Sequence, residues 1–156
     1  MKQERTNVMR LLDSLHLKFS EHTYESDGSL TGTEVAELIG QDPQQVFKTL
    51  VTVGNSGEHF VFVIPINKEL NLKKAAKATG QKSIEMVKSR DLLPLTGYIH
   101  GGCSPIGMKK FFKTTIDETA ILFDTIIFSA GKIGFQVEIS LDELKKAIDF
   151  SLADLV

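Results

Sequence analysis

The sequence predicts one α/β domain, residues 1–156, in which helices pack around a mostly antiparallel or mixed sheet. Two pairs of segments rich in β-branched and aromatic residues are each joined by a short glycine-containing connection, which is typical of hairpins. Other segments carry apolar residues at helical spacing. Because hairpins join antiparallel strands, they exclude a purely alternating parallel architecture. With 42% apolar residues and no linker or repeat, the chain is suited to a single core.

The first forty residues predict two helices separated by a strand. Apolar residues at helical spacing mark a helix over 8–15. The segment 18–24, KFSEHTY, is compatible with a strand. A second helix spans 31–40, because the Thr31 hydroxyl can cap the amide of Glu34 while the Glu34 side chain reaches back, and a glycine then stops the helix.

A short helix and two hairpins are predicted next. The Asp-Pro pair at 42–43 predicts the helix, since aspartate caps helices and proline fits their first position. Residues 49–53 and 59–65 predict one hairpin. Residues 125–129 and 135–140 predict the other.

Three further helices are predicted around these hairpins. Capping residues mark two of them, at about 72–79 and 84–91, the second with Ser83 as its cap. Between 93 and 109 the periodicity disappears, and glycines and prolines predict a loop. A last helix starts with a capping box and spans 140–150.

Composition excludes several classes of protein. The single cysteine excludes a disulfide framework within the chain and fits a reducing compartment. No apolar run reaches the roughly 18 residues of a membrane span, and the first ten residues lack the apolar region of a signal peptide. The histidines lack the spacing of metal ligands. We therefore expect a cytoplasmic protein with no metal, no cofactor and no membrane partner.

Charge is divided unevenly along the chain. The net charge is −2, but residues 68–113 contain ten basic and three acidic residues, a local charge of +7. The rest of the chain has eight basic and seventeen acidic residues, or −9. Phosphate attraction acts within a Debye length of about 8 to 10 Å, so local charge decides docking. These lysines either coat two amphipathic helices or bind an anionic partner, in which case added salt weakens binding with a shallow slope.

The segment 97–107, GYIHGGCSPIG, is the strongest candidate for a ligand-binding loop. Gly101 and Gly102 remove two side chains, so a ligand can approach the backbone amides directly. Such amides can bind a phosphate, or a carbonyl oxygen that gains charge during attack. The loop is not a Walker loop, since no glycine-rich run ends in GKS or GKT. It is not a G-x-S-x-G elbow either, since Ile106 occupies the place of the final glycine around Ser104. A purely structural turn is the alternative interpretation.

Other candidate residues are less specific. Cys103 could act as a nucleophile with His100 as its base, but unpaired cysteines are commonly buried apolar residues. Lys48, at a predicted helix-to-strand junction, could direct its ammonium group into a cleft or lie on the surface with its stem packed. The small-residue segment 129–134, SAGKIG, is explained by a hairpin connection alone.

Five segments, in order, resemble the YbaK/EbsC family, free-standing relatives of the editing domain inserted in bacterial prolyl-tRNA synthetases. These are HTYE (22–25), VFKTL (46–50), LNLKKAAKATG (70–80), TGYIHGGCSPIGMKK (96–110) and SAGKIGFQVEI (129–139). The resemblance covers nearly the whole chain, and its most specific part is GGCSPIG with the preceding F-K-T. It implies a predominantly antiparallel, barrel-like sheet surrounded by helices.

The resemblance also implies an activity, hydrolysis of the ester that joins a wrong amino acid to tRNA. The characteristic substrate of the YbaK branch is Cys-tRNA(Pro), and prolyl-tRNA synthetase is an expected partner besides the acceptor end of the tRNA. The family is thought to let the substrate's own thiol attack its carbonyl. That would explain why the chain shows no evident nucleophile, since positioning and oxyanion donors, each worth about 10²- to 10³-fold, then suffice.

Residue roles follow from the same resemblance. Lys48 would hold the terminal adenosine or its phosphate, and amides near Gly101 and Gly102 would orient and polarise the carbonyl. Two departures bear on amino-acid specificity, because Gln136 stands where many members are expected to be acidic and Thr31 where some carry phenylalanine. The predicted substrate-binding residues are Tyr24, Thr31, Thr49, Ser104, Pro105, Ser129, Gly131 and Gln136.

Three alternatives stay open at this point. The chain could edit another small residue, as in Ala-tRNA(Pro). It could be a non-catalytic module that binds a tRNA end or a nucleotide, or a protein-interaction domain with a structural glycine loop. Lys48 and GGCSPIG favour the enzyme, and a panel of mischarged tRNAs distinguishes the alternatives.

Overall fold

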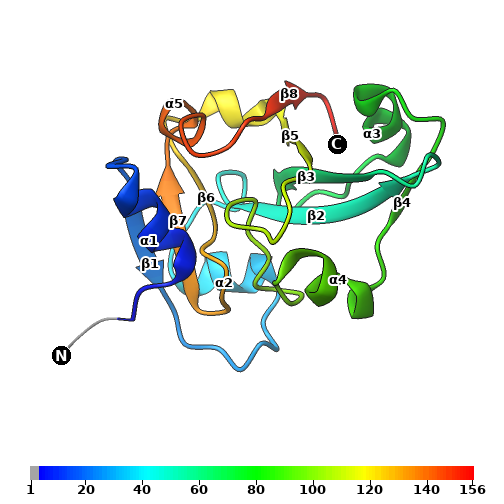
Figure 1. Ribbon diagram of the computed structural model, residues 1–156. Helices are drawn as coiled ribbons and strands as arrows, with labels where there is room; N and C mark the ends of the chain where they lie inside the picture. The colour runs from blue at the N-terminus through cyan, green and yellow to red at the C-terminus, as the bar shows by residue number, and fades with distance from the viewer. Residues whose placement is uncertain (1–3) are drawn as a thin grey trace.

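Two sheets organise the structure, a computed structural model that describes residues 4–156 (Figure 1). An antiparallel sheet has the order β1-β7-β6, with β1 at Ser20–Thr23, β7 at Phe135–Ile139 and β6 at Ile126–Ser129. A mixed sheet has the order β4-β2-β3-β5-β8, with strands Ile84–Met86, Phe47–Gly54, His59–Pro65, Lys113–Asp117 and Ser151–Ala153. A parallel bridge between Val46 and Ile127 connects the two sheets, and within residues 4–156 they stay open instead of closing into a barrel.

Both predicted hairpins are confirmed. β2 and β3 pair antiparallel from Phe47 opposite Pro65 to Val53 opposite His59. β6 and β7 pair in the same way around a tight turn. Alternate residues of β2 and β3 are buried on the two faces of the sheet, which explains why both strands are rich in apolar residues.

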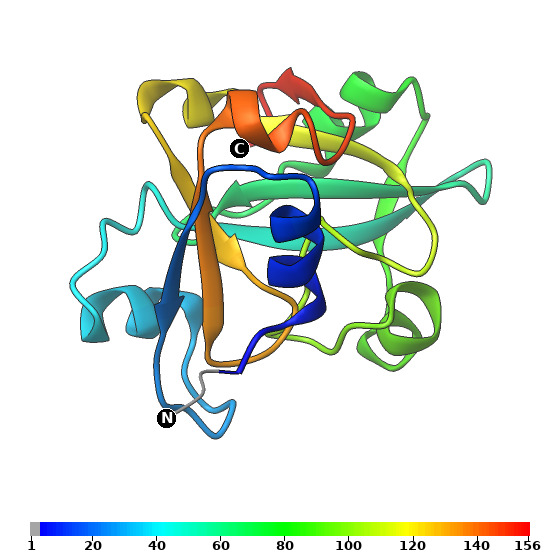
Figure 2. The ribbon, with the colours of Figure 1, turned by 60° about the vertical axis from the view of Figure 1, so that its left-hand side comes forward.

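The first helices are also confirmed, and local capping explains their ends. α1 spans Asn7–Ser14, α2 Gly32–Leu38 and α3 Leu72–Thr79. In α2 both bonds of the predicted capping box are present, between Thr31 and Glu34. Figure 2 shows α1 lying across the three-stranded sheet, where it buries one apolar face.

The core has one main cluster and two smaller ones. The main cluster joins α1 to the inner faces of both sheets, with Leu12, Val63 and Phe128 among its fully buried members. A second cluster lies between α3 and the outer face of the five-stranded sheet. The third is small and sits under α2, where Ala36 packs with Val46 and Ile127. This last contact positions the candidate site.

Two predicted helices are wrong. The Asp-Pro pair at 42–43 starts a turn, because the Asp42 carboxylate accepts from the amide of Gln44 at 2.9 Å and the chain then enters β2. Residues 84–91 do not form one helix, since Ile84–Met86 is the strand β4 and α4 spans Ser89–Thr96. Ser83 is no helix cap, because its carbonyl accepts from Asn55 at the hairpin tip and so aligns β4 with β2.

The C-terminal prediction is correct only at its start. Ser140 caps a helix as expected, but α5 covers only Leu141–Leu144, and turns lead from it to β8. Strand β5, the 3-10 helix η1 at Glu118–Leu122 and strand β8 were not predicted. β5 pairs in parallel with both β3 and β8, so its position depends on distant segments. No helix within residues 4–156 is both long and apolar enough to cross a bilayer.

Candidate functional site

Strand pairing gathers three of the predicted site residues on one face of the three-stranded sheet. Ser129 of β6 lies opposite Gln136 of β7, and Gln136 lies opposite His22 of β1. Residues two apart on a strand point to the same side, so Tyr24, which follows β1, continues the face of His22. The same face carries Ile127, which packs under α2. Tyr24, Ser129 and Gln136 therefore share the α2 side of this sheet.

Lys48 is brought to the same side by the bridge between the sheets. At Val46 and Ile127 the chain segments run parallel, and Lys48 and Ser129 each follow two residues later. The Lys48 side chain is 31% exposed, and its Nζ lies 4.0 Å from Oε1 of Glu69, whose side chain is 97% exposed. An exposed pair at this distance contributes little to stability, so it does not prevent the ammonium group from binding an anion.

The glycine-rich loop packs directly on the turn that follows β6. A Cβ at Gly102 would lie 3.3 Å from the backbone nitrogen of Ile133, a tight contact that favours glycine at this position. Gly101 has a φ of +86° and is exposed beside the Ile133 side chain. The Gly102 amide donates to the Ile99 carbonyl at 3.0 Å. Of the two glycines, Gly101 is therefore the one placed to offer its amide to a ligand.

Buried residues follow these glycines and fix the shape of the loop. The Ser104 hydroxyl accepts from the amide of Ile106 at 3.3 Å and is completely buried, and Pro105 is buried as well. Cys103 is 8% exposed, and burial raises the pKa of its thiol to about 12. A thiol with this pKa is protonated at neutral pH, which argues against Cys103 as a nucleophile. His100 is exposed beside the loop.

Two of the predicted substrate-binding residues, Thr31 and Thr49, do not lie on the same side as Lys48 with a free hydroxyl group. The Thr31 hydroxyl accepts from the amide of Glu34 at 3.1 Å, so it acts as a helix cap. Thr49 follows Lys48 on β2 and so points to the opposite face of the sheet. Its hydroxyl oxygen is buried and has no hydrogen-bond partner within residues 4–156.

The turn after β6 is held by its own side chains and by Tyr98. The Ser129 hydroxyl accepts from the amide of Gly131 at 3.1 Å. Gly131 has a φ of +94°, and a Cβ there would lie 2.8 Å from the Tyr98 ring. The Tyr98 hydroxyl donates to the carbonyl of Ile106, and burial raises its pKa to about 12. Tyr98 thus joins this turn to the glycine-rich loop.

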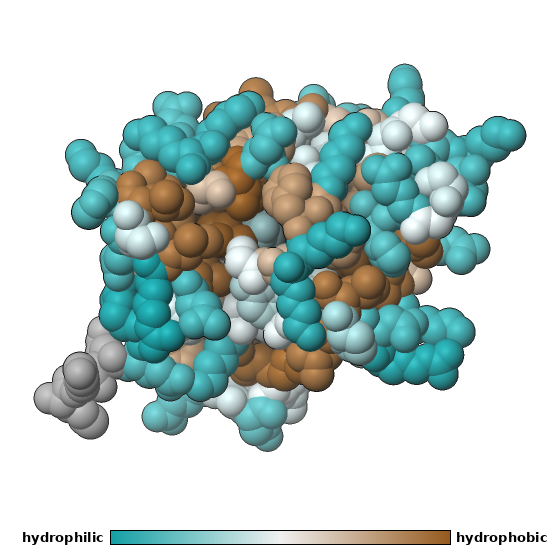
Figure 3. Space-filling model, viewed as in Figure 1, coloured by the Kyte–Doolittle hydropathy of each residue, from teal (hydrophilic) through white to brown (hydrophobic). Residues whose placement is uncertain are grey.

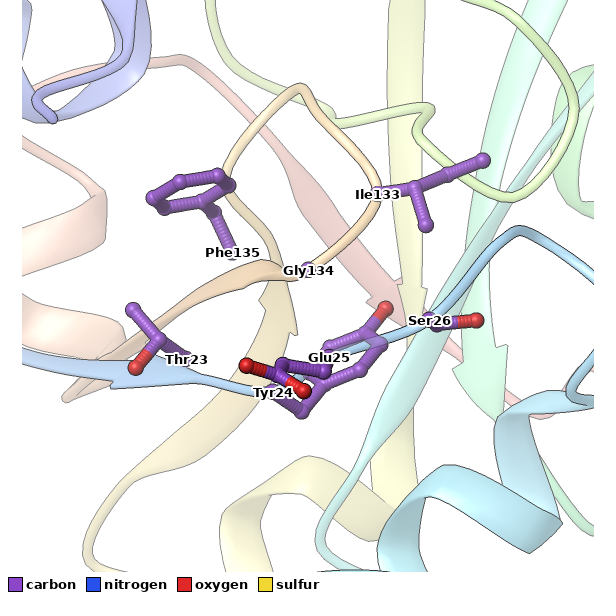
Figure 4. Close-up of a pocket in the computed structure, with 7 residues that line it drawn as sticks. All are labelled: Thr23, Tyr24, Glu25, Ser26, Ile133, Gly134 and Phe135. Atoms are coloured by element: carbon purple, nitrogen blue, oxygen red, sulfur yellow. The ribbon is translucent and has the colours of Figure 1, made fainter.

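A cavity of about 430 Å³ opens where β1 and this turn meet. Figure 4 shows Tyr24 and Ser26 on one wall and Ile133 and Phe135 on the other. Gly134, between them, accepts from the amide of Tyr24 at 3.0 Å. The cavity is therefore lined by Tyr24, one of the predicted site residues, and by Ile133, which lies against Gly101 and Gly102 of the glycine-rich loop.

A second cavity, of about 610 Å³, is lined by residues that the sequence did not indicate, among them His22, Gln41 and Glu138. Gln41 donates from Nε2 to Oε1 of Gln136 at 2.8 Å. Nε2 of His22 lies 2.7 Å from Oε1 of Glu138. Burial alone would raise the pKa of Glu138, but hydrogen bonds from Thr125 and His22 outweigh it and lower that pKa. The Gln41–Gln136 and His22–Glu138 contacts can be recognised only once the strand register is known. Within residues 4–156 no three His, Cys, Asp or Glu side chains are grouped as metal ligands would be.

Comparison with known proteins identifies a family that matches most of the chain. Residues 28–147 match the family described as the aminoacyl-tRNA editing domain. The chain is 44% identical over 154 residues to EbsC of Enterococcus faecalis, a candidate Cys-tRNA(Pro)/Cys-tRNA(Cys) deacylase, with 98% of this chain and 94% of EbsC covered. A proline–tRNA ligase of Fervidobacterium nodosum is 28% identical over 99 residues, which are 64% of this chain and 17% of the ligase.

A solved structure shows the same fold. It is that of a candidate trans-editing enzyme for prolyl-tRNA synthetase, with a TM-score of 0.80 and 24% identity. The superposition covers 97% of this chain and 98% of the other.

Proposed function

This chain belongs to the aminoacyl-tRNA editing domain family, and from that premise we propose that it deacylates mischarged tRNA, with cysteinyl-tRNA(Pro) as its substrate. The observation that supports the proposal is the parallel bridge between Val46 and Ile127, since Lys48 follows Val46, and Ser129 follows Ile127, two residues later. The similarity to EbsC supports the choice of substrate because it extends along nearly all of both chains.

The mechanism needs no protein nucleophile. The Lys48 ammonium group would bind the ribose or phosphate of the terminal adenosine, and the Gly101 amide would donate to the ester carbonyl. The thiol of the cysteinyl group then attacks the carbonyl carbon. A C–S bond forms as the ester C–O bond breaks, and the thiol proton is transferred to the departing ribose oxygen. Water finally opens the resulting thiolactone. The rate enhancement comes from positioning of the substrate and from one hydrogen-bond donor to the oxyanion. This donor contributes about 10²- to 10³-fold.

The test is a deacylation assay with cysteinyl-, alanyl- and prolyl-tRNA(Pro). We expect the parent to hydrolyse the cysteinyl ester fastest. The Lys48→Ala variant should hydrolyse it at least about tenfold more slowly, because an ionic contact to the substrate is removed. Cys103→Ala should retain the parental rate. Lys18→Ala, which removes an exposed lysine outside the site, is the matched control.

Each alternative gives a different result in this assay. Preference for the alanyl ester would exclude attack by a substrate thiol. Binding of tRNA without turnover would instead identify a non-catalytic module. Loss of activity in a folded Cys103→Ala variant would make the protein thiol part of the reaction.

A further inference from the structure

Basic residues in the segment 68–113 have few partners inside the protein. Of the ten Lys and Arg residues in this segment, only Lys74 forms an ion pair within residues 4–156, with Asp154 at 2.9 Å. Outside this segment, four of the seven Lys and Arg residues within residues 4–156 are paired with acids, namely Arg5, Lys48, Lys132 and Lys146. An ion pair neutralises the field of a lysine locally, whereas unpaired lysines attract anions from solution. The segment therefore presents its positive charge outward.

Two of these lysines, Lys109 and Lys113, are placed by the contacts of α4 and of the five-stranded sheet. Register places Met86 of β4, Thr52 of β2, Phe60 of β3 and Lys113 of β5 in one row across four strands. α4 follows β4, and the stem of Lys109 lies against Gly97 at the end of α4. In Figure 1 β4 lies on the right beside the tip of the β2–β3 hairpin, α4 lies below β2, and β5 lies nearer the centre.

We define the basic strip as the three exposed cations that surround Phe111 along the chain, which have no ion-pair partner within residues 4–156. They are Lys109, Lys110 and Lys113. Figure 3 shows hydrophilic side chains next to exposed hydrophobic ones on the face of the molecule seen in Figure 1.

Phe111 is the aromatic residue that lies within this strip. Its neighbour Phe112 packs against the main core, and the Phe112 ring centroid lies 5.4 Å from that of His59. With Phe112 turned inward, Phe111 is 54% exposed, flanked along the chain by Lys110 and Lys113. An exposed aromatic ring among unpaired lysines is the combination that binds single-stranded nucleic acid, because bases stack on the ring and phosphates contact the lysines.

We propose that the basic strip binds the acceptor end of tRNA, with its lysines on the phosphates and Phe111 stacked on an unpaired base. This inference rests on the proposed function, which makes tRNA the substrate. The strip and the candidate site are joined by one loop, since Gly101 and Phe111 both belong to the connection between α4 and β5.

The lysines are tested by measuring the affinity of uncharged tRNA(Pro) as a function of salt concentration. In the triple variant Lys109→Gln/Lys110→Gln/Lys113→Gln we expect at least about tenfold weaker binding near 0.1 M salt and a salt slope lower by about 2 to 3, since each lost phosphate contact reduces the slope by about 0.7 to 0.9. The matched control, Arg10→Gln/Lys18→Gln/Lys146→Gln, removes the same charge from exposed positions outside the segment and should bind within about twofold of the parent. Equal losses in both triple variants would refute the proposal, because only net charge would matter.

Phe111 is tested with two RNA probes, a single-stranded oligonucleotide ending in CCA and a blunt duplex. Phe111→Ala should weaken binding of the single strand about five- to hundredfold, the effect of losing one base stack, and should leave the duplex unchanged. Phe111→Tyr should restore binding of the single strand. Equal effects of Phe111→Ala on both probes would refute stacking.

These measurements are independent of catalysis because none of the three RNAs carries an aminoacyl ester. If deacylation fails while the strip binds tRNA as expected, only the proposed function is wrong. If the lysine variant binds tRNA normally but loses binding to poly-glutamate, the strip serves an acidic protein and the inference is wrong.

Discussion

Gln41 and Gln136 are joined side chain to side chain, with Nε2 of Gln41 donating to Oε1 of Gln136 at 2.8 Å. Gln136 is only 6% exposed, so this bond satisfies a buried amide. It also ties the segment after α2 to β7, the strand that carries part of the candidate site. Gln136 is therefore both a structural residue and a predicted substrate contact.

Gln136→Ala should lower the free energy of unfolding by about 1 to 3 kcal/mol, because it leaves the Gln41 amide without its partner in a buried setting. Urea unfolding followed by circular dichroism measures this. Gln44→Ala, at an exposed position nearby, should change stability by less than about 0.5 kcal/mol. Equal effects at both positions would mean that the hydrogen bond contributes nothing.

Gly134→Ala should be more damaging than the same change at Gly57. Both glycines have positive φ, +96° and +89°, so both variants are strained. At Gly134, however, the new Cβ would lie 2.9 Å from the Tyr24 carbonyl, whereas at Gly57 no atom lies within 4 Å. The additional loss of stability at Gly134, about 1 to 3 kcal/mol, measures this clash. Deacylation should fall with Gly134→Ala alone, since only that change displaces Tyr24.

Local signals explain what could be predicted of the fold. The capping box at Thr31 and Glu34 involves residues three apart, and the helix stop at Gly80 is equally local. Strand β4 depends instead on contacts with the hairpin tip, where Asn55 Oδ1 accepts from the amide of Lys82 at 2.8 Å. The pattern at 84–91 resembles a helix, but its first three residues form the edge strand β4, because pairing at the edge of the sheet buries Ile84.

The same distinction applies to the candidate site. Gly101 and Gly102 are recognisable from the sequence because they are consecutive residues of one loop, and the packing of Gly102 on Ile133 favours glycine there. The Gln41–Gln136 bond joins residues 95 positions apart. No periodicity or motif in a single sequence indicates such a pair, because the register of β1, β6 and β7 must be known first.

Cys103 should resist alkylation in the folded protein and react after unfolding in urea, since burial raises its pKa from 9.0 to about 12. The unfolded thiol ionises first, so the stability that this shift provides is fully present below about pH 9 and falls as the pH rises toward 12. Tyr98 titrates over an overlapping range, so the parent must be compared with Cys103→Ala. The variant should lose less stability between pH 9 and 11. A thiol that reacts rapidly in the native protein would contradict this.

Glu138 should make the stability of the protein sensitive to acid. Burial alone would raise the pKa of this carboxyl group, but hydrogen bonds from Thr125 and His22 lower it below its ordinary value of 4.5. A carboxylate with a lowered pKa stabilises the fold above the pKa of the unfolded chain, and this contribution is lost as the pH falls through the folded-state value. Glu138→Gln should therefore cost about 1 to 2 kcal/mol at pH 7, where bonds to the charged group are intact, and progressively less toward pH 3. Urea unfolding over this pH range tests it, with the exposed Glu37→Gln as control. A difference between Glu138→Gln and the parent that does not change with pH would show that the carboxylate's charge makes no contribution.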